Sequence, residues 1–101
     1  MMIRIVKLHF QDDKIDQFLA FFDTIKEKVN EFPGCLGMKL LRDINNPSIV
    51  MTYSHWNEAQ DLENYRTSET FGTIWPTIKP WFAEKPEAWS VEEHFNGFDR
   101  G

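Results

Sequence analysis

Residues 2–10 show a two-residue alternation of side chains, which predicts a first β-strand. One side of this strand comprises Arg4, Val6, Leu8 and Phe10, and is apolar except for Arg4. The other side is half apolar and comprises Ile3, Ile5, Lys7 and His9. We expect the side with Val6, Leu8 and Phe10 to face a helix layer, and the opposite side to be partly covered by something else.

The spacing of apolar residues then changes to the three-to-four-residue period of an α-helix. The apolar face of this helix comprises Ile15, Phe18, Leu19, Phe22, Ile25 and Val29. Asp12 and Asp13 precede it and suit a helix N-terminus, where backbone N–H groups favour negative charge. The helix should end at residues 32–34, because Pro33 cannot continue the hydrogen-bond ladder and Gly34 allows a turn.

Two further strands are predicted at residues 35–41 and 48–53, where β-branched and aromatic residues are frequent. Between them, residues 43–47 have the Asp, Asn and Pro content of a turn. Because the connection is short, we expect these two strands to form an antiparallel hairpin.

A second helical region should begin at Asn57, with Gln60 three residues later in a capping-box arrangement. Ser68 predicts a second cap or a break, after which apolar residues return at helical spacing. Pro76 and Pro80 lack the N–H that a regular helix requires, so we expect a broken helix that kinks or stops at Pro76. Residues 88–95 alternate again and predict the last strand.

The predicted order is therefore βαββαβ, which indicates an α+β, ferredoxin-like fold. In this fold one antiparallel sheet carries two helices on one face. The second face would carry Ile3 and Ile5, and a second copy of the chain is the simplest cover for them, so we expect a homodimer. At 101 residues, we expect residues 1–101 to form one domain.

Charge and cysteine content exclude several classes of function. The formal net charge is -5 without any Lys/Arg run, which argues against nucleic-acid binding. No segment approaches the roughly 20 apolar residues that span a membrane. Cys35 is the single cysteine and cannot form an internal disulfide, so we expect a reducing, cytoplasmic setting.

Other types of chemical site have little support. Cys35 follows a turn with no feature that would activate its thiol, so we interpret it as structural. His9, His55 and His94 lack metal-site spacing, and we predict no metal. The glycines form no nucleotide-binding motif, and we predict no nucleotide cofactor.

Aromatic residues concentrate in residues 53–82, which hold three of the four tryptophans and both tyrosines. Two interpretations stay open. The stretch can supply a bulky core with a dimer contact, or it can wall an apolar pocket for a small molecule. A twice-interrupted helix packs less closely on a sheet than a regular helix does, and Tyr65 and Trp75 can hydrogen-bond inside a pocket; both points favour the pocket.

One motif resembles a known family. Residues 48–59 read SIVMTYSHWNEA, and residues 65–71 read YRTSETF. These segments resemble the antibiotic biosynthesis monooxygenase (ABM) family, whose members have a strand ending in tryptophan and then an H-x-x-S-x-x-F pattern. Tyr65 stands where that pattern has histidine. Tyrosine has a pKa of about 10 and is a poor base at neutral pH, but it can hydrogen-bond a phenolate.

The resemblance implies a dimeric α/β barrel and oxidation of a small aromatic phenol or quinol by O2 without a cofactor. Related haem-degrading members use an Asn/Trp/His set, and the matching positions here are Val6, Trp75 and Tyr65, without the haem-ligating histidine. We predict Tyr65 and His55 as catalytic residues, Tyr65 as the hydrogen-bond partner and His55 as the proton acceptor. The predicted substrate-binding residues are Phe22, Phe71, Trp75 and Trp81. The alternatives are a non-catalytic binding or sensing dimer and a purely structural dimer with a filled core.

Overall fold

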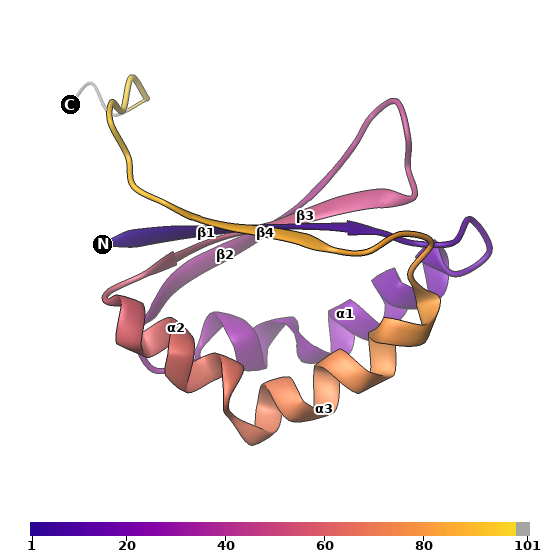
Figure 1. Cartoon of the computed structure of the whole chain (residues 1–101), viewed down its shortest axis with the longest axis horizontal. Helices are drawn as coiled ribbons and strands as arrows, with labels where there is room; N and C mark the ends of the chain where they lie inside the picture. The colour runs from indigo at the N-terminus through magenta and orange to yellow at the C-terminus, as the bar shows by residue number, and fades with distance from the viewer. Residues whose placement is uncertain (99–101) are drawn as a thin grey trace.

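The computed structural model describes residues 1–98 and shows one sheet with a layer of helices on one side (Figure 1). The strands are antiparallel in the order β2-β3-β1-β4, as the ferredoxin-like prediction requires. In chain order the elements are β1 (Met2–His9), α1 (Ile15–Asn30), β2 (Cys35–Arg42), β3 (Ile49–Trp56), α2 (Ala59–Arg66), α3 (Glu69–Ile78), the 3₁₀ helix η1 (Lys79–Trp81) and β4 (Glu87–Val91). The sheet is open, and all three α-helices lie on the same side of it (Figure 1).

The strand register separates two faces of the sheet. On the helix-facing side of β1, Leu8 and Phe10 are buried, as the alternation predicted. On the other side, which we call the outer face, Ile5 is paired with Tyr53 of β3 and with Trp89 of β4. These three side chains form a row across three strands, because directly paired residues point to the same side of a sheet.

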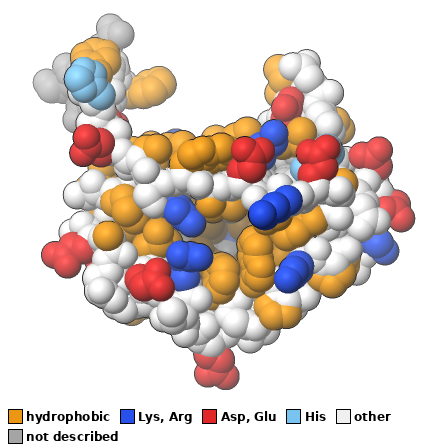
Figure 2. All heavy atoms as spheres, viewed as in Figure 1, with side chains coloured by type: hydrophobic (Ala, Val, Ile, Leu, Met, Phe, Trp, Pro, Cys, Tyr) orange, Lys and Arg blue, Asp and Glu red, His pale blue; other side chains and the backbone are white. Residues whose placement is uncertain are grey.

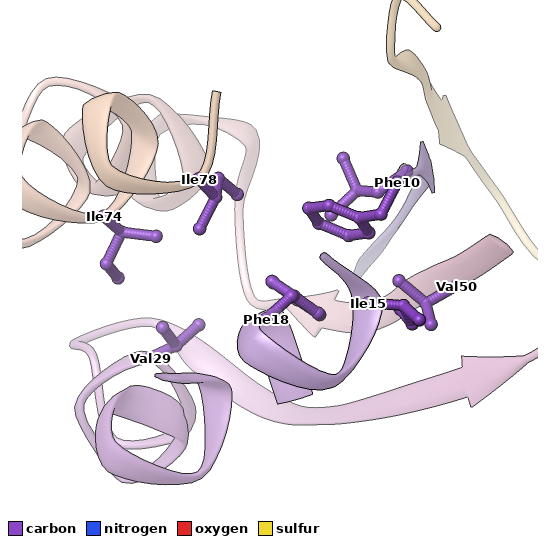
Figure 3. Close-up of a cluster of buried hydrophobic side chains, with 8 residues drawn as sticks. Phe10, Ile15, Phe18, Val29, Val50, Ile74 and Ile78 are labelled. Atoms are coloured by element: carbon purple, nitrogen blue, oxygen red, sulfur yellow. The ribbon is translucent and has the colours of Figure 1, made fainter. Parts of the chain in front are cut away.

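The core fills the space between the sheet and α1 and α3 (Figure 3). Phe10 lies at its centre: the ring is fully buried and stacks on Phe18, with ring centroids 4.3 Å apart. The other buried members of the core come from β1, α1, β3 and α3, and partly buried apolar side chains, among them Met38 and Leu40 of β2, pack against them. The labelled residues in Figure 3 are Phe10, Ile15, Phe18, Val29, Val50, Ile74 and Ile78.

The second helical region is divided at Ser68, as predicted: the Ser68 hydroxyl accepts a hydrogen bond from the Phe71 N–H at 3.2 Å and caps a separate α-helix, so three helices rather than two cover the sheet. Helix α2 is capped by Glu58 in a capping box with Asp61, not by Asn57 with Gln60. The Asn57 N–H instead donates to the carbonyl of Gly34, which joins this corner to the β2 turn.

Pro76 does not stop its helix, although a stop was one of the two predicted outcomes. Helix α3 continues through Pro76 to Ile78 and only then tightens into the 3₁₀ turn that contains Pro80. Pro76 and Gly72 are both exposed, so water can solvate the Gly72 carbonyl that proline leaves without a partner. A proline on the solvent side of a helix therefore costs less than one on its packed side.

The last strand is also shorter than predicted, since it ends at Val91 and not at residue 95. Val91 is paired with Ile3, and β1 begins only one residue before Ile3. Beyond Val91 almost no β1 backbone remains to accept or donate ladder hydrogen bonds. The chain instead leaves the sheet and rises above its outer face (Figure 1).

Candidate functional site

A cavity of about 350 Å³ lies between the sheet and the helix layer. Figure 2 shows its opening as a hollow surrounded by hydrophobic and basic side chains. An apolar cavity of about 150 Å³ already holds benzene, so this volume accommodates two or three fused rings. The bulky-core and pocket interpretations of residues 53–82 therefore both hold in part, because Trp81 and Phe82 pack against the core while Tyr65, Phe71 and Trp75 line an open space.

Aromatic rings from α2 and α3 form one wall of the cavity. Tyr65 contacts Phe71 edge to face with centroids 5.4 Å apart, and Phe71 stacks on Trp75 at 5.5 Å with 15° between the ring planes. Phe71 and Trp75 are four residues apart and share one face of α3, whereas Tyr65 contacts Phe71 across the break between α2 and α3. The opposite wall comes from the sheet and includes Val6 and Thr52.

Tyr65 is the central polar residue of this wall. Its ring lies between Trp56, at 5.5 Å, and Phe71, and burial raises the pKa of Tyr65 to about 12, with a smaller contribution from nearby Cys35. Within residues 1–98 its hydroxyl forms no hydrogen bond. Tyr65 is thus a neutral phenol at physiological pH, able to donate a hydrogen bond to an anionic oxygen but not to abstract a proton.

The structure brings four of the six predicted site residues together. Tyr65, Phe22, Phe71 and Trp75 all line the cavity. Trp81 lies outside it and packs edge to face on Phe21 at 6.0 Å.

His55 is the other predicted residue that does not line the cavity. It is paired with Ile3 on the outer face, and its Nε2 lies 2.9 Å from the Tyr53 hydroxyl. Its neighbours Ser54 and Trp56, by contrast, line the cavity. The cause is the strand alternation: adjacent residues of β3 point to opposite sides of the sheet.

Two arginines line the cavity without having been predicted. Arg4 is the charged member of the otherwise apolar side of β1, and Arg66 is the last residue of α2. Burial lowers the pKa of Arg4, the Arg66 charge lowers it further, and Glu63 raises it. The sequence carried one signal for Arg4, namely a cation on the strand side that was expected to face the helices.

Among residues 1–98, no three His, Cys, Asp or Glu side chains lie close enough together to hold a metal ion. No helix in the same part of the chain is both long and apolar enough to cross a membrane.

A family model described as antibiotic biosynthesis monooxygenase matches residues 1–75. The chain belongs to the ABM family. The match covers the first three strands, α1, α2 and most of α3, and therefore most of the residues that line the cavity. No sequence match was found among curated proteins.

Solved structures confirm the ABM fold for nearly the whole chain. A protein from Nitrosomonas europaea, named as a candidate antibiotic biosynthesis monooxygenase, superposes with a TM-score of 0.86 at 19% identity, covering 94% of this chain and 100% of that one. A conserved protein from Methanosarcina mazei Go1 gives 0.84 at 20% identity, covering 92% and 93%. Rv0793 from Mycobacterium tuberculosis gives 0.85 at 10% identity, covering 95% and 97%. At these identities the likeness concerns the fold.

Proposed function

We propose that this ABM protein oxidises a small aromatic phenol or quinol with O2 and without a bound cofactor. The observation that carries the proposal is the cavity of about 350 Å³, in which the neutral hydroxyl of Tyr65 belongs to a wall of aromatic rings. Such a cavity suits a flat, apolar substrate with one polar oxygen. Membership of the ABM family supports oxygen chemistry as the reaction class.

The proposed reaction converts a phenol with a free para carbon to a para-quinone. The phenolate supplies electrons to O2; one oxygen atom becomes the new carbonyl, and the other leaves as water with the phenolic proton and the displaced ring hydrogen. Tyr65 donates its O–H to the phenolate oxygen and lowers the free energy of the ionised substrate. The apolar walls exclude water from the reduced oxygen species. The phenolic proton passes first to solvent, because Tyr65 cannot accept it, and the departing water takes up an equivalent proton from solvent.

Oxygen uptake with 1-naphthol tests the proposal. We expect the wild type to form 1,4-naphthoquinone with consumption of one O2, and one labelled oxygen atom in the product when ¹⁸O2 is supplied. Tyr65→Phe should lower kcat/KM by about 10- to 100-fold, since one donor to the developing anion is lost. The matched control is Tyr53→Phe, because Tyr53 lies on the outer face against His55 and should leave turnover unchanged.

A non-catalytic binding or sensing role is the second candidate. None of the described residues that line the cavity is a histidine, and the pKa of Tyr65 is about 12. No imidazole or phenol in the cavity wall therefore serves as a base at neutral pH. Tight binding of 1-naphthol by calorimetry, without oxygen uptake above the protein-free rate, would favour this role over the enzyme. Equal turnover in wild type and Tyr65→Phe would also contradict the mechanism.

We propose in addition that the chain works as a homodimer in which two outer faces close a barrel. Trp89 of the outer face is 44% exposed, and Phe95, in the segment that rises above this face, is 82% exposed (Figure 1). Exposed apolar surface of this kind marks an interface, and a short chain gains much by covering it. A second copy of the chain is a suitable partner, because its own outer face carries the same row of Ile5, Tyr53 and Trp89 and the two faces can cover each other.

Sedimentation measures the assembly directly. We expect the wild type to sediment at twice the 12.0 kDa of one chain, and Ile5→Asp to sediment as a folded monomer. The reason is that Ile5 lies in the middle of the outer face, so a carboxylate there would be desolvated in the dimer and hydrated in the monomer. The control is Asp23→Ala, at an exposed position of α1, and it should stay dimeric. A wild type that sediments as a monomer at micromolar concentration contradicts the proposal.

A further inference from the structure

Arg4 is an unbalanced cation in the wall of an apolar cavity. Its side chain is partly buried, and its Nη1 donates to the Ser90 hydroxyl at 2.9 Å, which holds the guanidinium through a neutral partner. Within residues 1–98 it forms no ion pair with a carboxylate. Arg4 is only partly buried, but with a single neutral partner it leaves most of its N–H donors available to a ligand.

Arg66 brings a second guanidinium to the same cavity. It forms an ion pair with Glu63 at 3.5 Å and is 50% exposed, which places it at the solvent side of the cavity. Of the acids nearby, Glu63 is thus engaged with Arg66, and Glu87, which also lines the cavity, lies 4.0 Å from Lys7. One positive charge remains without a partner, although the chain as a whole carries a net charge of -5.

The surface distribution agrees with this balance. Figure 2 shows Lys and Arg side chains gathered around the hollow, while most acidic side chains in that view lie farther out. In a protein with more acidic than basic residues, such a ring of cations attracts anions to the opening and repels cationic ligands.

We propose that the ligand of this cavity is an aromatic carboxylate, whose rings contact Phe71 and Trp75 and whose carboxylate binds Arg4 and Arg66. The proposal relies on the proposed function for the place of the site and adds the chemical class of the compound. A carboxylate matches the fork of a guanidinium in two parallel hydrogen bonds. A neutral ligand of the same shape would displace water from Arg4 and offer it no counter-charge.

The test compares two ligands that differ only in charge. Calorimetric titration at low salt with 2-naphthoate and 2-naphthamide requires no oxidation, since neither compound is a phenol. We expect the wild type to bind naphthoate at least about 10-fold more tightly than naphthamide, the usual gain of charge-assisted hydrogen bonds. Raising the salt concentration should weaken naphthoate binding and leave naphthamide binding unchanged.

Charge-removing variants locate the effect. Arg4→Gln and Arg66→Gln should each lower naphthoate affinity by about 10-fold and leave naphthamide affinity unchanged. The matched control is Lys28→Gln, which removes one positive charge from an exposed position of α1 and should keep the preference. Arg4→Lys retains the positive charge but loses the two parallel donors of the guanidinium, so it should keep only part of the preference for naphthoate over naphthamide. Circular dichroism of each variant should match the wild type, which checks that the variant is folded.

The outcomes separate this inference from the proposed function. Equal affinities for naphthoate and naphthamide in the wild type, or no binding of either, overturn the inference without any variant. If the protein oxidises 1-naphthol but binds naphthoate and naphthamide equally well, the monooxygenase proposal is supported and the carboxylate proposal is contradicted. A naphthoate preference lost in Arg4→Gln, without oxygen uptake from any phenol, supports the carboxylate site and contradicts the enzyme.

Discussion

Phe10→Ala should lower the free energy of unfolding by about 3–5 kcal/mol, the usual cost of removing a fully buried phenylalanine. Phe10 has 0% exposure and contacts both Phe18 and Phe82, at centroid distances of 4.3 and 5.2 Å. The vacated volume cannot collapse easily, because β1, α1 and the segment after η1 all meet there. A chain of this size has a total stability of about 5–15 kcal/mol, so the variant should be close to unfolding at 37 °C.

Urea denaturation followed by circular dichroism measures this effect. The control is Ile44→Ala in the β2–β3 turn, where the side chain is 95% exposed and truncation should change stability by less than about 0.5 kcal/mol. A loss under about 1 kcal/mol in Phe10→Ala would show that this site is not the packing centre of the fold.

Gly34→Ala should lower the free energy of unfolding by about 2–4 kcal/mol, because Gly34 packs against the start of α2. Gly34 has a φ of +89°, which costs about 1–2 kcal/mol for a residue with a Cβ. An added Cβ would also overlap the side chain of Asp61, which caps α2 by accepting from the Glu58 N–H at 3.1 Å. Relief of the overlap would displace the start of the helix that presents Tyr65 to the cavity.

Comparing the thermal unfolding of Gly34→Ala with that of Gly72→Ala distinguishes a local effect at Gly34 from a general effect of replacing glycine. Gly72 lies in α3 with open space around it, so alanine there should stabilise the chain by about 0.5–1 kcal/mol. If both variants are equally stable, the overlap with Asp61 is relieved without cost and the prediction is wrong.

The predictable part of the site was its aromatic wall. Phe71 and Trp75 lie four residues apart on one predicted helix face, Tyr65 was singled out by its place in the family motif, and Phe22 came from the apolar face of α1. His55 was chosen by residue type, and residue type does not tell which side of a strand faces the helices. Trp81 was drawn in by its place in the aromatic stretch, yet the 3₁₀ turn directs it to Phe21.

Short-range patterns along the chain determined the element order and the α+β class, because the periods of two and of about 3.6 residues are properties of neighbouring positions. Tertiary structure decided which residues share the cavity. Arg4 and Arg66 lie at distant points of the chain; the strand alternation placed Arg4 on the expected helix-facing side, but no sequence pattern brought Arg66 next to it. They line one cavity because the register places Arg4 on the helix-facing side of a central strand, while the packing of α2 on that side brings in Arg66.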